Sequence, residues 1–239
     1  MVQDGKTDGA RGADAAGAKE RPWEMRIWSG ITAGAWWRIL ARNRFAVSPS
    51  RIGMAAILVL ISGLNSLLWL MQTIFLGRRI ARTQLVEDPV FVLGHWRSGT
   101  TLLHELLAAD PRHAFANTYA SFAPNHFLLT GRLFPKLLRL LLPPMRPMDN
   151  MPIGWDYPQE DEWAMCNMGL PSPYLTLVFP NRPPQFQEYL DLREVPPEAL
   201  EKWKAAFRWF LRCLTAQNPK RIVLKSPQHT CRVRTLLAM

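Results

Sequence analysis

Residues 94–101 contain the side chains and the spacing best suited to chemistry in this sequence. They read Gly94-His95-Trp96-Arg97-Ser98-Gly99-Thr100-Thr101, after a short apolar run and before a leucine-rich one. Glycines let a backbone approach a ligand closely, and a loop that leads into a helix N-terminus turns its N–H groups toward an anion. The spacing therefore predicts a phosphate-binding loop. The alternative is a glycine-containing turn with a purely structural role, in which His95 and Trp96 only pack the turn.

The position of the cation distinguishes this loop from those that bind nucleoside triphosphates. Such loops need Gly-Lys-Ser/Thr, with the lysine reaching the β- and γ-phosphates. Here Thr100 stands in the lysine position, and the cation is Arg97, two residues before Gly99. The loop is therefore expected to hold a phosphate of another kind. An atypical ATP-dependent kinase remains an alternative, and it should bind ATP together with Mg²⁺.

The elements around the loop indicate an α/β fold with a P-loop-type parallel sheet flanked by helices. Residues 89–93 and 221–224 are short β-branched runs typical of buried strands, and 114–117 is a weaker candidate. Helices are predicted over 100–109 and 128–142, and from Pro197 onward. The proline-rich stretch 143–197 is predicted to be mainly extended. Two confident strands are few for such a sheet, so the domain is expected to be incomplete.

The loop and the second strand resemble a known family. Arg97-Ser98-Gly99-Thr100-Thr101 after a buried strand is similar to the cofactor loop of sulfotransferases that use 3′-phosphoadenosine 5′-phosphosulfate (PAPS). Lys225-Ser226-Pro227 resembles the second motif of the bacterial and tyrosylprotein branches. Asn125-His126 and Gln159-Glu160-Asp161-Glu162 look like bacterial members. The resemblance covers about residues 85–239.

The resemblance implies roles for particular residues. Arg97 would contact the 5′-phosphate side of the donor, and Ser98, Gly99, Thr100 and Thr101 would bind the 5′-phosphate. Lys225 would contact the transferring sulfuryl group, and no metal would be required. In the family, an Arg and a Ser after the second core strand bind the 3′-phosphate. The chain ends before that segment, so it is expected to be C-terminally truncated, and both an active and an inactive form remain alternatives.

The general base is not fixed by the resemblance. A base must reach the acceptor hydroxyl and titrate near neutral pH, which favours histidine. His229, beside the Lys225 motif, is the first choice, with a solvent-facing helix start as its alternative role. His126 is the second candidate, although it could simply cap a turn. The acidic run Glu160–Glu162 is the third, and such runs are more often solvated surface. His104 is expected to be structural or exposed.

The N-terminal third differs in composition from the rest. Residues 1–84 hold 12 Lys and Arg against 5 Asp and Glu, so most of the net charge of +10 lies there. Residues 1–22 are predicted to be a disordered tail. Trp28, Trp36 and Trp37 among arginines suit either an interfacial helix or one packed on the protein.

Residues 53–77 form an uncharged stretch of 25 residues, long enough to cross a bilayer. Its polar side chains recur with helical spacing, however, which favours a helix that lies at the membrane interface or docks onto the domain. This polar stripe comprises Ser62, Asn65, Ser66, Trp69, Gln72 and Thr73. Three units follow: the tail 1–22, a helical membrane-associated or docked region 23–84, and a partial sulfotransferase domain 85–239.

Composition excludes several classes of protein. With 48% hydrophobic and 20% charged residues the chain is globular, and three scattered cysteines without a C-x-x-C pair argue against a zinc ribbon or disulfide scaffold. Basic residues beside an apolar stretch favour a membrane surface over nucleic acid. We expect a cytoplasmic enzyme, membrane-associated or single-pass, with a Golgi-type signal anchor as the alternative. The acceptor is expected to be a small or lipid-like molecule bearing a hydroxyl or amine. A non-catalytic membrane-associated fragment is the remaining hypothesis.

Overall fold

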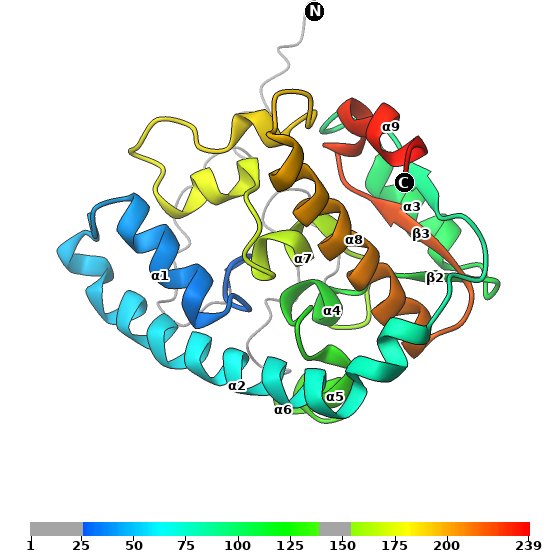
Figure 1. Ribbon diagram of the computed structural model, residues 1–239, viewed down its shortest axis with the longest axis horizontal. Helices are drawn as coiled ribbons and strands as arrows, with labels where there is room; N and C mark the ends of the chain where they lie inside the picture. Colours follow the sequence, from blue (N-terminus) through cyan, green and yellow to red (C-terminus); the bar gives the residue numbers. More distant parts are fainter. Residues whose placement is uncertain (1–25, 139–153) are drawn as a thin grey trace, which may run out of the picture.

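The computed structural model describes residues 26–138 and 154–239, so the predicted tail 1–22 and residues 139–153 lie outside the described residues. The elements follow one another as shown in Figure 1. They are α1 (Ala33–Arg42), η2 (Pro49–Arg51), α2 (Ile52–Arg82), β1 (Val90–Val92), α3 (Thr100–Ala108), β2 (His113–Phe115), α4 (Thr118–Phe122), α5 (Phe127–Thr130), α6 (Phe134–Leu137), α7 (Asp161–Asn167), η4 (Pro173–Val178), η5 (Gln187–Tyr189), α8 (Pro197–Gln217), β3 (Arg221–Lys225) and α9 (His229–Leu237).

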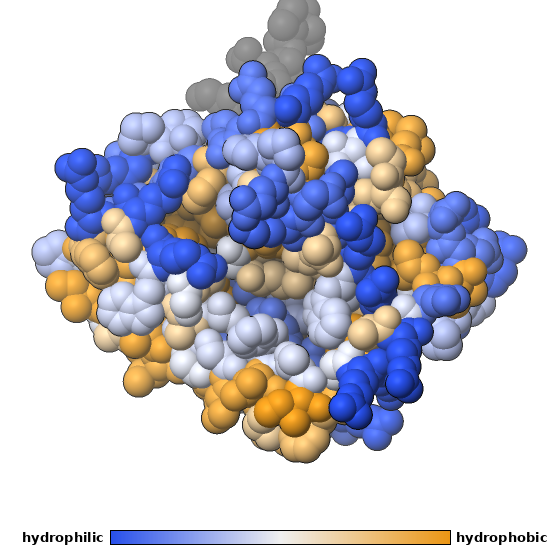
Figure 2. Space-filling view, viewed as in Figure 1, coloured by the Kyte–Doolittle hydropathy of each residue, from blue (hydrophilic) through white to orange (hydrophobic). Residues whose placement is uncertain are grey.

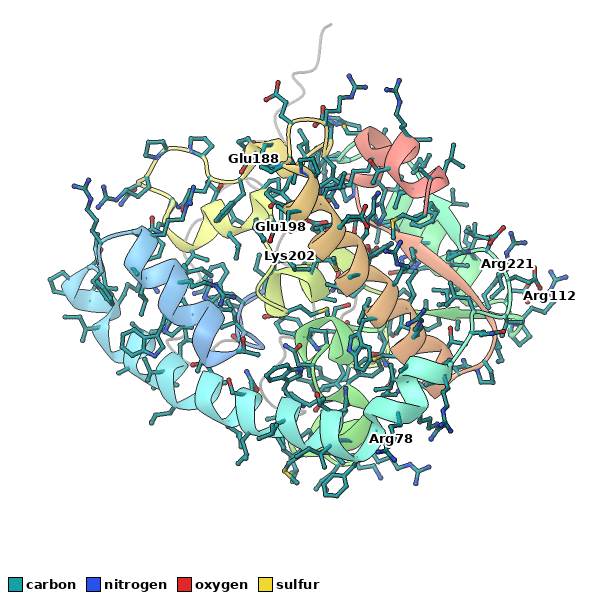
Figure 3. All side chains as sticks on the ribbon, viewed as in Figure 1. Arg78, Arg112, Glu188, Glu198, Lys202 and Arg221 are labelled. Atoms are coloured by element: carbon teal, nitrogen blue, oxygen red, sulfur yellow. The ribbon has the colours of Figure 1, made fainter. Side chains whose placement is uncertain are left out.

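The three described strands form a parallel sheet in the order β1-β3-β2, which confirms the predicted α/β class and the weaker strand near residue 114. Lys225 pairs with Val92 at the carboxyl ends of β3 and β1. Because β1 runs directly into the predicted phosphate loop, this register brings Lys225 next to the loop. The opposite, amino-terminal end of the sheet carries Arg221 and, just before β2, Arg112 (Figure 3).

Helix α8 supplies much of the core against the sheet. Its amphipathic pattern puts a continuous stripe of apolar side chains on one face. These side chains are Trp203, Phe207, Phe210, Leu211 and Leu214, all buried. They share one cluster with Ile222 and Leu224 of β3. Side chains alternate between the faces of a strand, so Val223 and Lys225 lie on the other face, toward α3. Figure 1 shows α8 and α3 on opposite sides of β3.

Helix α2 runs along one edge of the molecule with α1 packed beside its first half (Figure 1). Ser62, Asn65 and Gln72 are buried against the protein, whereas the opposite face of α2 is apolar and exposed. The helix is also long and apolar enough to cross a membrane by length and composition. Trp36 of α1 is buried and Trp37 is exposed, so α1 packs on the protein by one face.

Two predictions about the middle of the chain were wrong. The single helix expected over 128–142 is replaced, within its described part, by the short helices α5 and α6. Gly131 ends α5 and Pro135 opens α6, and proline is favoured only in the first turn of a helix. The stretch expected to be mainly extended contains α7, η4 and η5 in its described part. The prolines of this described part stand at the starts of elements or between them, where they do not interrupt helical hydrogen bonds.

Candidate active site

The predicted phosphate loop lies where the sheet geometry expects it, between β1 and the N-terminus of α3. Gly99 is the residue before the helix and has a left-handed backbone with φ of 82°, a conformation that glycine adopts without strain. The N–H groups in the first turn of α3 have no acceptors within the helix itself. They are therefore oriented to bind an anion, and the partial positive charge of the helix end adds to the attraction.

Two features show that the loop is shaped for close approach. A Cβ added to Gly94 would lie 2.4 Å from Cγ2 of Thr100 and 2.8 Å from Oγ of Ser98, so any side chain there would force Thr100 and Ser98 to move. Arg97 has φ of 63°, a left-handed conformation that costs a non-glycine residue free energy and recurs at functional sites. Arg97 and Ser98 are exposed on the loop. The loop is thus an open, strained turn over a helix N-terminus.

The segment after β3 fastens this loop in place. The backbone N–H of Gly94 donates to Oγ1 of Thr230 at 2.8 Å, and the Thr230 hydroxyl donates to the Gly94 carbonyl at 3.1 Å. Within the loop, the Ser98 hydroxyl donates to the carbonyl of His95 at 2.6 Å. Helix α9 therefore positions the loop, a function of Thr230 that the sequence did not reveal.

Lys225 is the buried cation beside the loop. Its Nζ donates to Oε1 of Glu160 at 2.5 Å, and the Tyr174 hydroxyl donates to Oε2 of the same carboxylate at 2.7 Å. The Lys225 and Glu160 side chains are 6% and 12% exposed, so they reach the surface only slightly. Burial, followed by the charge of Glu160, raises the pKa of Tyr174, which keeps it protonated as a donor. Three elements thus meet at one carboxylate.

The next two carboxylates of the acidic run are fully buried, which rules out the solvated-surface reading for Asp161 and Glu162. Asp161 accepts from Ser226 at 3.0 Å and lies 2.7 Å from Nε2 of His229. Glu162 pairs with Arg232 and accepts from Ser172. Burial acts to raise the pKa of Asp161, but the contacts with His229 and Ser226 outweigh it and lower the pKa below its ordinary value.

The predicted base candidates have different surroundings. His229, the first choice, has a fully buried ring held against Asp161 and against the edge of Phe91. His126 is buried elsewhere, away from the acidic run Glu160–Glu162. Its Nδ1 contacts the hydroxyl of Thr130, and its Nε2 lies near Asn65. His104 is buried inside α3, and burial lowers its pKa to about 4. Among the candidates, Glu160 alone adjoins Lys225 and still has exposed side-chain surface.

Several buried side-chain atoms of the described residues have no hydrogen-bond partner. They include Nδ1 of His229 and Nε2 of His104, but also the indole nitrogens of Trp36 and Trp203, so they are spread over the protein. The donor site is therefore defined by the close fit of Gly94, the N–H groups at the start of α3 and the cation of Lys225, and these residues suit a phosphate-bearing donor.

Some of these site residues were predicted from the sequence, and others were not. The structure places Arg97, Ser98 and Gly99 on the loop, Thr100 and Thr101 in the first turn of α3, and Lys225 on the adjacent strand. The amino-acid pattern indicated no role for Thr230 or Arg232, and it did not reveal the contact of Tyr174 with Glu160. Their signal was weak, because each acts through a contact with a residue far along the chain. The spacing of Lys225, His229 and Arg232 against three consecutive acidic residues was the one available hint.

Comparisons with known proteins agree with this geometry. A model of a family described as "Sulfotransferase family" matches residues 89–239. Two curated relatives, from Mycobacterium bovis and Mycobacterium tuberculosis, are each 48% identical over 217 residues. Both are called "Omega-hydroxy-beta-dihydromenaquinone-9 sulfotransferase Stf3". The alignment covers 91% of this chain but 56% of each relative, so the chain spans about half their length.

A solved structure supports the fold. The crystal structure of sulfotransferase STF1 from Mycobacterium tuberculosis H37Rv matches with a TM-score of 0.50 at 18% identity. The match covers 86% of this chain and 56% of that one. At this identity the likeness bears on the arrangement of helices and strands, and it agrees with the P-loop-type sheet described above.

Proposed function

The chain belongs to the sulfotransferase family, and on that premise we propose that it transfers a sulfuryl group from PAPS to an acceptor hydroxyl or amine. The observation that carries the proposal is the placement of Lys225 at the end of β3, paired with Val92 and so beside the glycine loop. A cation at that point lies next to a phosphate held by the loop. Sulfuryl transfer, like in-line phosphoryl transfer, depends mainly on positioning and on stabilising charge.

The loop residues divide the work of binding the donor. Ser98, Gly99, Thr100 and Thr101 would bind the 5′-phosphate through the first N–H groups of α3 and through hydroxyls, and Arg97 would add its charge. The donor supplies a sulfuryl group attached to a phosphate leaving group. Lys225 would neutralise the negative charge that develops between the sulfuryl group and the leaving phosphate in the transition state, as preorganised donors do at oxyanion sites.

We infer that the base is Glu160 rather than His229. A general base must reach the acceptor, and the His229 ring is fully buried with one nitrogen on Asp161. Glu160 lies 2.5 Å from Lys225, and Tyr174 fixes the orientation of its carboxylate. His229 would then be a positioning residue that holds Asp161 and, through Ser226, the turn after Lys225.

The acceptor we propose is the hydroxyl of a lipid. The relatives from both mycobacteria carry a name that describes a hydroxylated menaquinone as substrate. In this chain, the outward face of α2 is apolar over several turns, and the large apolar side chains that it exposes include Leu60, Leu67, Leu70, Ile74 and Phe75. Figure 2 shows hydrophobic surface along the edge where α2 runs.

The charges around α2 fit an anionic membrane surface. Arg51 precedes the helix, and Arg78, Arg79 and Arg82 lie in its last turns, with Arg78 on the outer edge in Figure 3. Arginines beside an apolar face bind lipid headgroups while the face enters the interface. We therefore propose an enzyme of the cytoplasmic membrane surface, with α2 lying in the interface rather than crossing the bilayer.

Donor binding tests the assignment without knowledge of the acceptor. Isothermal titration should detect 3′-phosphoadenosine 5′-phosphate in metal-free buffer, and Arg97→Ala should weaken this binding about 10- to 150-fold, since a charge-assisted contact contributes about 1.5–3 kcal/mol. Arg112→Ala, at the other end of the sheet, should bind as the original protein does. Tight binding of ATP with Mg²⁺ instead would favour a kinase. Absence of binding to either nucleotide would favour a non-catalytic fragment.

A further inference from the structure

An apolar trough lies between α2 and the helices that follow β2. Six residues of α2 line one wall, at the spacing of one helical face: Met54, Ile57, Leu58, Ile61, Leu64 and Asn65. From Met54 to Asn65 the helix rises about 16 Å, so the trough is elongated rather than round. Its volume is about 230 Å³.

The opposite wall comes from the core. It includes Phe122, Ala123 and His126, which are buried, and Phe134 of α6. Nearly all of the lining surface is apolar. Arg26 lines the trough and is its one charged lining residue among the described residues. Two of the polar side chains deep in the trough are engaged with the protein: Asn65 donates to the carbonyls of Ser29 and Ile31, and it approaches His126. A ligand here would thus be held by apolar contact, without directional recognition.

The mouth of the trough opens on the face that we assign to the membrane. Ile57, Ile61 and Leu64 line the trough and are also 52%, 36% and 49% exposed. Leu60 and Ile74, on the outward face of the same helix, are 75% and 66% exposed. An apolar chain lying in the interface could therefore enter the trough without crossing water.

The trough is also within reach of the proposed base. Trp155 lines it, and Glu160 follows only five positions later, a distance along the chain of about 17 Å at most. Phe122 of the trough wall contacts Trp163 of α7, with ring centroids 5.5 Å apart. Helix α7 begins one residue after Glu160. A chain of several isoprene units could thus lie in the trough while its hydroxyl lies near Lys225.

From this placement we propose that the trough between α2 and α4–α6 binds the apolar chain of the lipid acceptor. The inference rests on the proposed function, since it presumes an acceptor with a long apolar chain. Helix α2 would then have two functions. One face attaches the enzyme to the membrane, and the neighbouring face binds the apolar chain of the acceptor. Burial of apolar surface supplies the affinity, at about 25 cal/mol per Å².

Photoaffinity labelling tests this without any sulfuryl transfer. The probe is a hexadecanol that carries a diazirine in its chain, presented to the protein in detergent micelles. Labelled residues are then located by mass spectrometry. We expect labels on the α2 residues that line the trough, such as Leu58, Ile61 and Leu64, and on Phe122 or Ala123. Labels confined to outward positions such as Leu60, Leu70 and Ile74 would mean contact with the micelle only, and would overturn the proposal.

Two neighbouring variants sharpen the experiment. Ile61→Asp puts a charge at the mouth of the trough and should reduce labelling of its wall at least about tenfold, because an apolar chain cannot pair a charge. Leu60→Asp removes the same kind of side chain from the micelle-facing surface but does not line the trough, so labelling should change less than about twofold. Equal losses in both variants would contradict the proposal. Labelling without transfer from PAPS would contradict the proposed function alone.

Discussion

Three consecutive carboxylates organise the site, and each has its own partner on the β3–α9 segment. Glu160 pairs with Lys225, Asp161 with His229 and Glu162 with Arg232. Buried charges are tolerated only when paired. These three pairs, which we call the ladder, therefore hold the acidic run Glu160–Glu162 against the β3–α9 segment. The sequence showed the acidic run and the basic residues separately. It could not show that they meet, because 65 to 70 residues lie between the partners.

The charge of Lys225 is the residue-scale feature with the clearest consequence. Lys225→Ala should lower the rate of transfer from PAPS to a hydroxylated menaquinone by about 10²–10³, as removal of one preorganised donor does elsewhere. Binding of 3′-phosphoadenosine 5′-phosphate should weaken by a smaller factor than the rate, because this product keeps the 5′-phosphate beside Lys225 but lacks the sulfuryl group. Transfer of ³⁵S label in micelles measures the rate, and titration measures the binding.

Lys202→Ala provides the matched control. Lys202 lies on the exposed side of α8 and pairs with Glu198 (Figure 3), a surface contact worth little free energy. Its removal should leave both rate and binding unchanged. If Lys225→Ala retained the original rate, Lys225 would have only a structural role in the ladder.

At the scale of the element, α2 reverses the usual pattern of an amphipathic helix. The spacing of its polar side chains predicted one polar face, and the structure turns most of that face inward. Gln72 accepts from the backbone N–H groups of Leu128 and Leu129 at 3.0 and 3.2 Å, and Ser66 accepts from that of Ala33 at 2.9 Å. Periodicity could reveal the stripe. It could not identify the partners, which are backbone N–H groups at the starts of α1 and α5.

Replacing Gln72 distinguishes a docked helix from a spanning one. Gln72→Leu makes α2 more apolar, which would favour a membrane span. In the docked arrangement it leaves the backbone N–H of Leu128 without its acceptor, whereas that of Leu129 still donates to the carbonyl of His126, and should lower the free energy of unfolding by about 1 kcal/mol. Urea denaturation in mild detergent measures the change. Thr73→Leu, exposed on the next position, should leave stability unaltered, and a gain in stability from Gln72→Leu would contradict docking.

At the scale of the whole molecule, one edge of the sheet and one long helix set the arrangement. The carboxyl ends of β1 and β3 bring the loop and Lys225 together, as open parallel sheets generally do. The strands and α8 were predictable because their apolar patterns are local and strong. The end of α5 and the start of α6 were harder to predict. The apolar run favours one continuous helix, and only Gly131 and Pro135 indicate that it is interrupted.

Buried histidines couple the whole fold to pH. His104, between the loop and the ladder, and His126, under α2, each have a pKa lowered from 6.5 to about 4, chiefly because burial disfavours the charged imidazolium. In the unfolded chain both take up a proton near pH 6.5. Between pH 6.5 and 4 the unfolded state therefore binds more protons, and the free energy of unfolding must fall as the pH falls.

Each histidine should contribute up to about 3 kcal/mol to this loss, which is complete near pH 4. Asp161 has a lowered pKa and is affected only below the ordinary range of aspartate, so its contribution falls in a separate, more acidic window. Urea denaturation at steps between pH 7 and 4 gives the slope. His126→Gln should flatten it by about half, whereas His95→Gln, on the exposed loop, should leave it intact. An unchanged slope in His126→Gln would mean that this imidazole titrates alike in the folded and unfolded chains, and that α2 does not shield it from water.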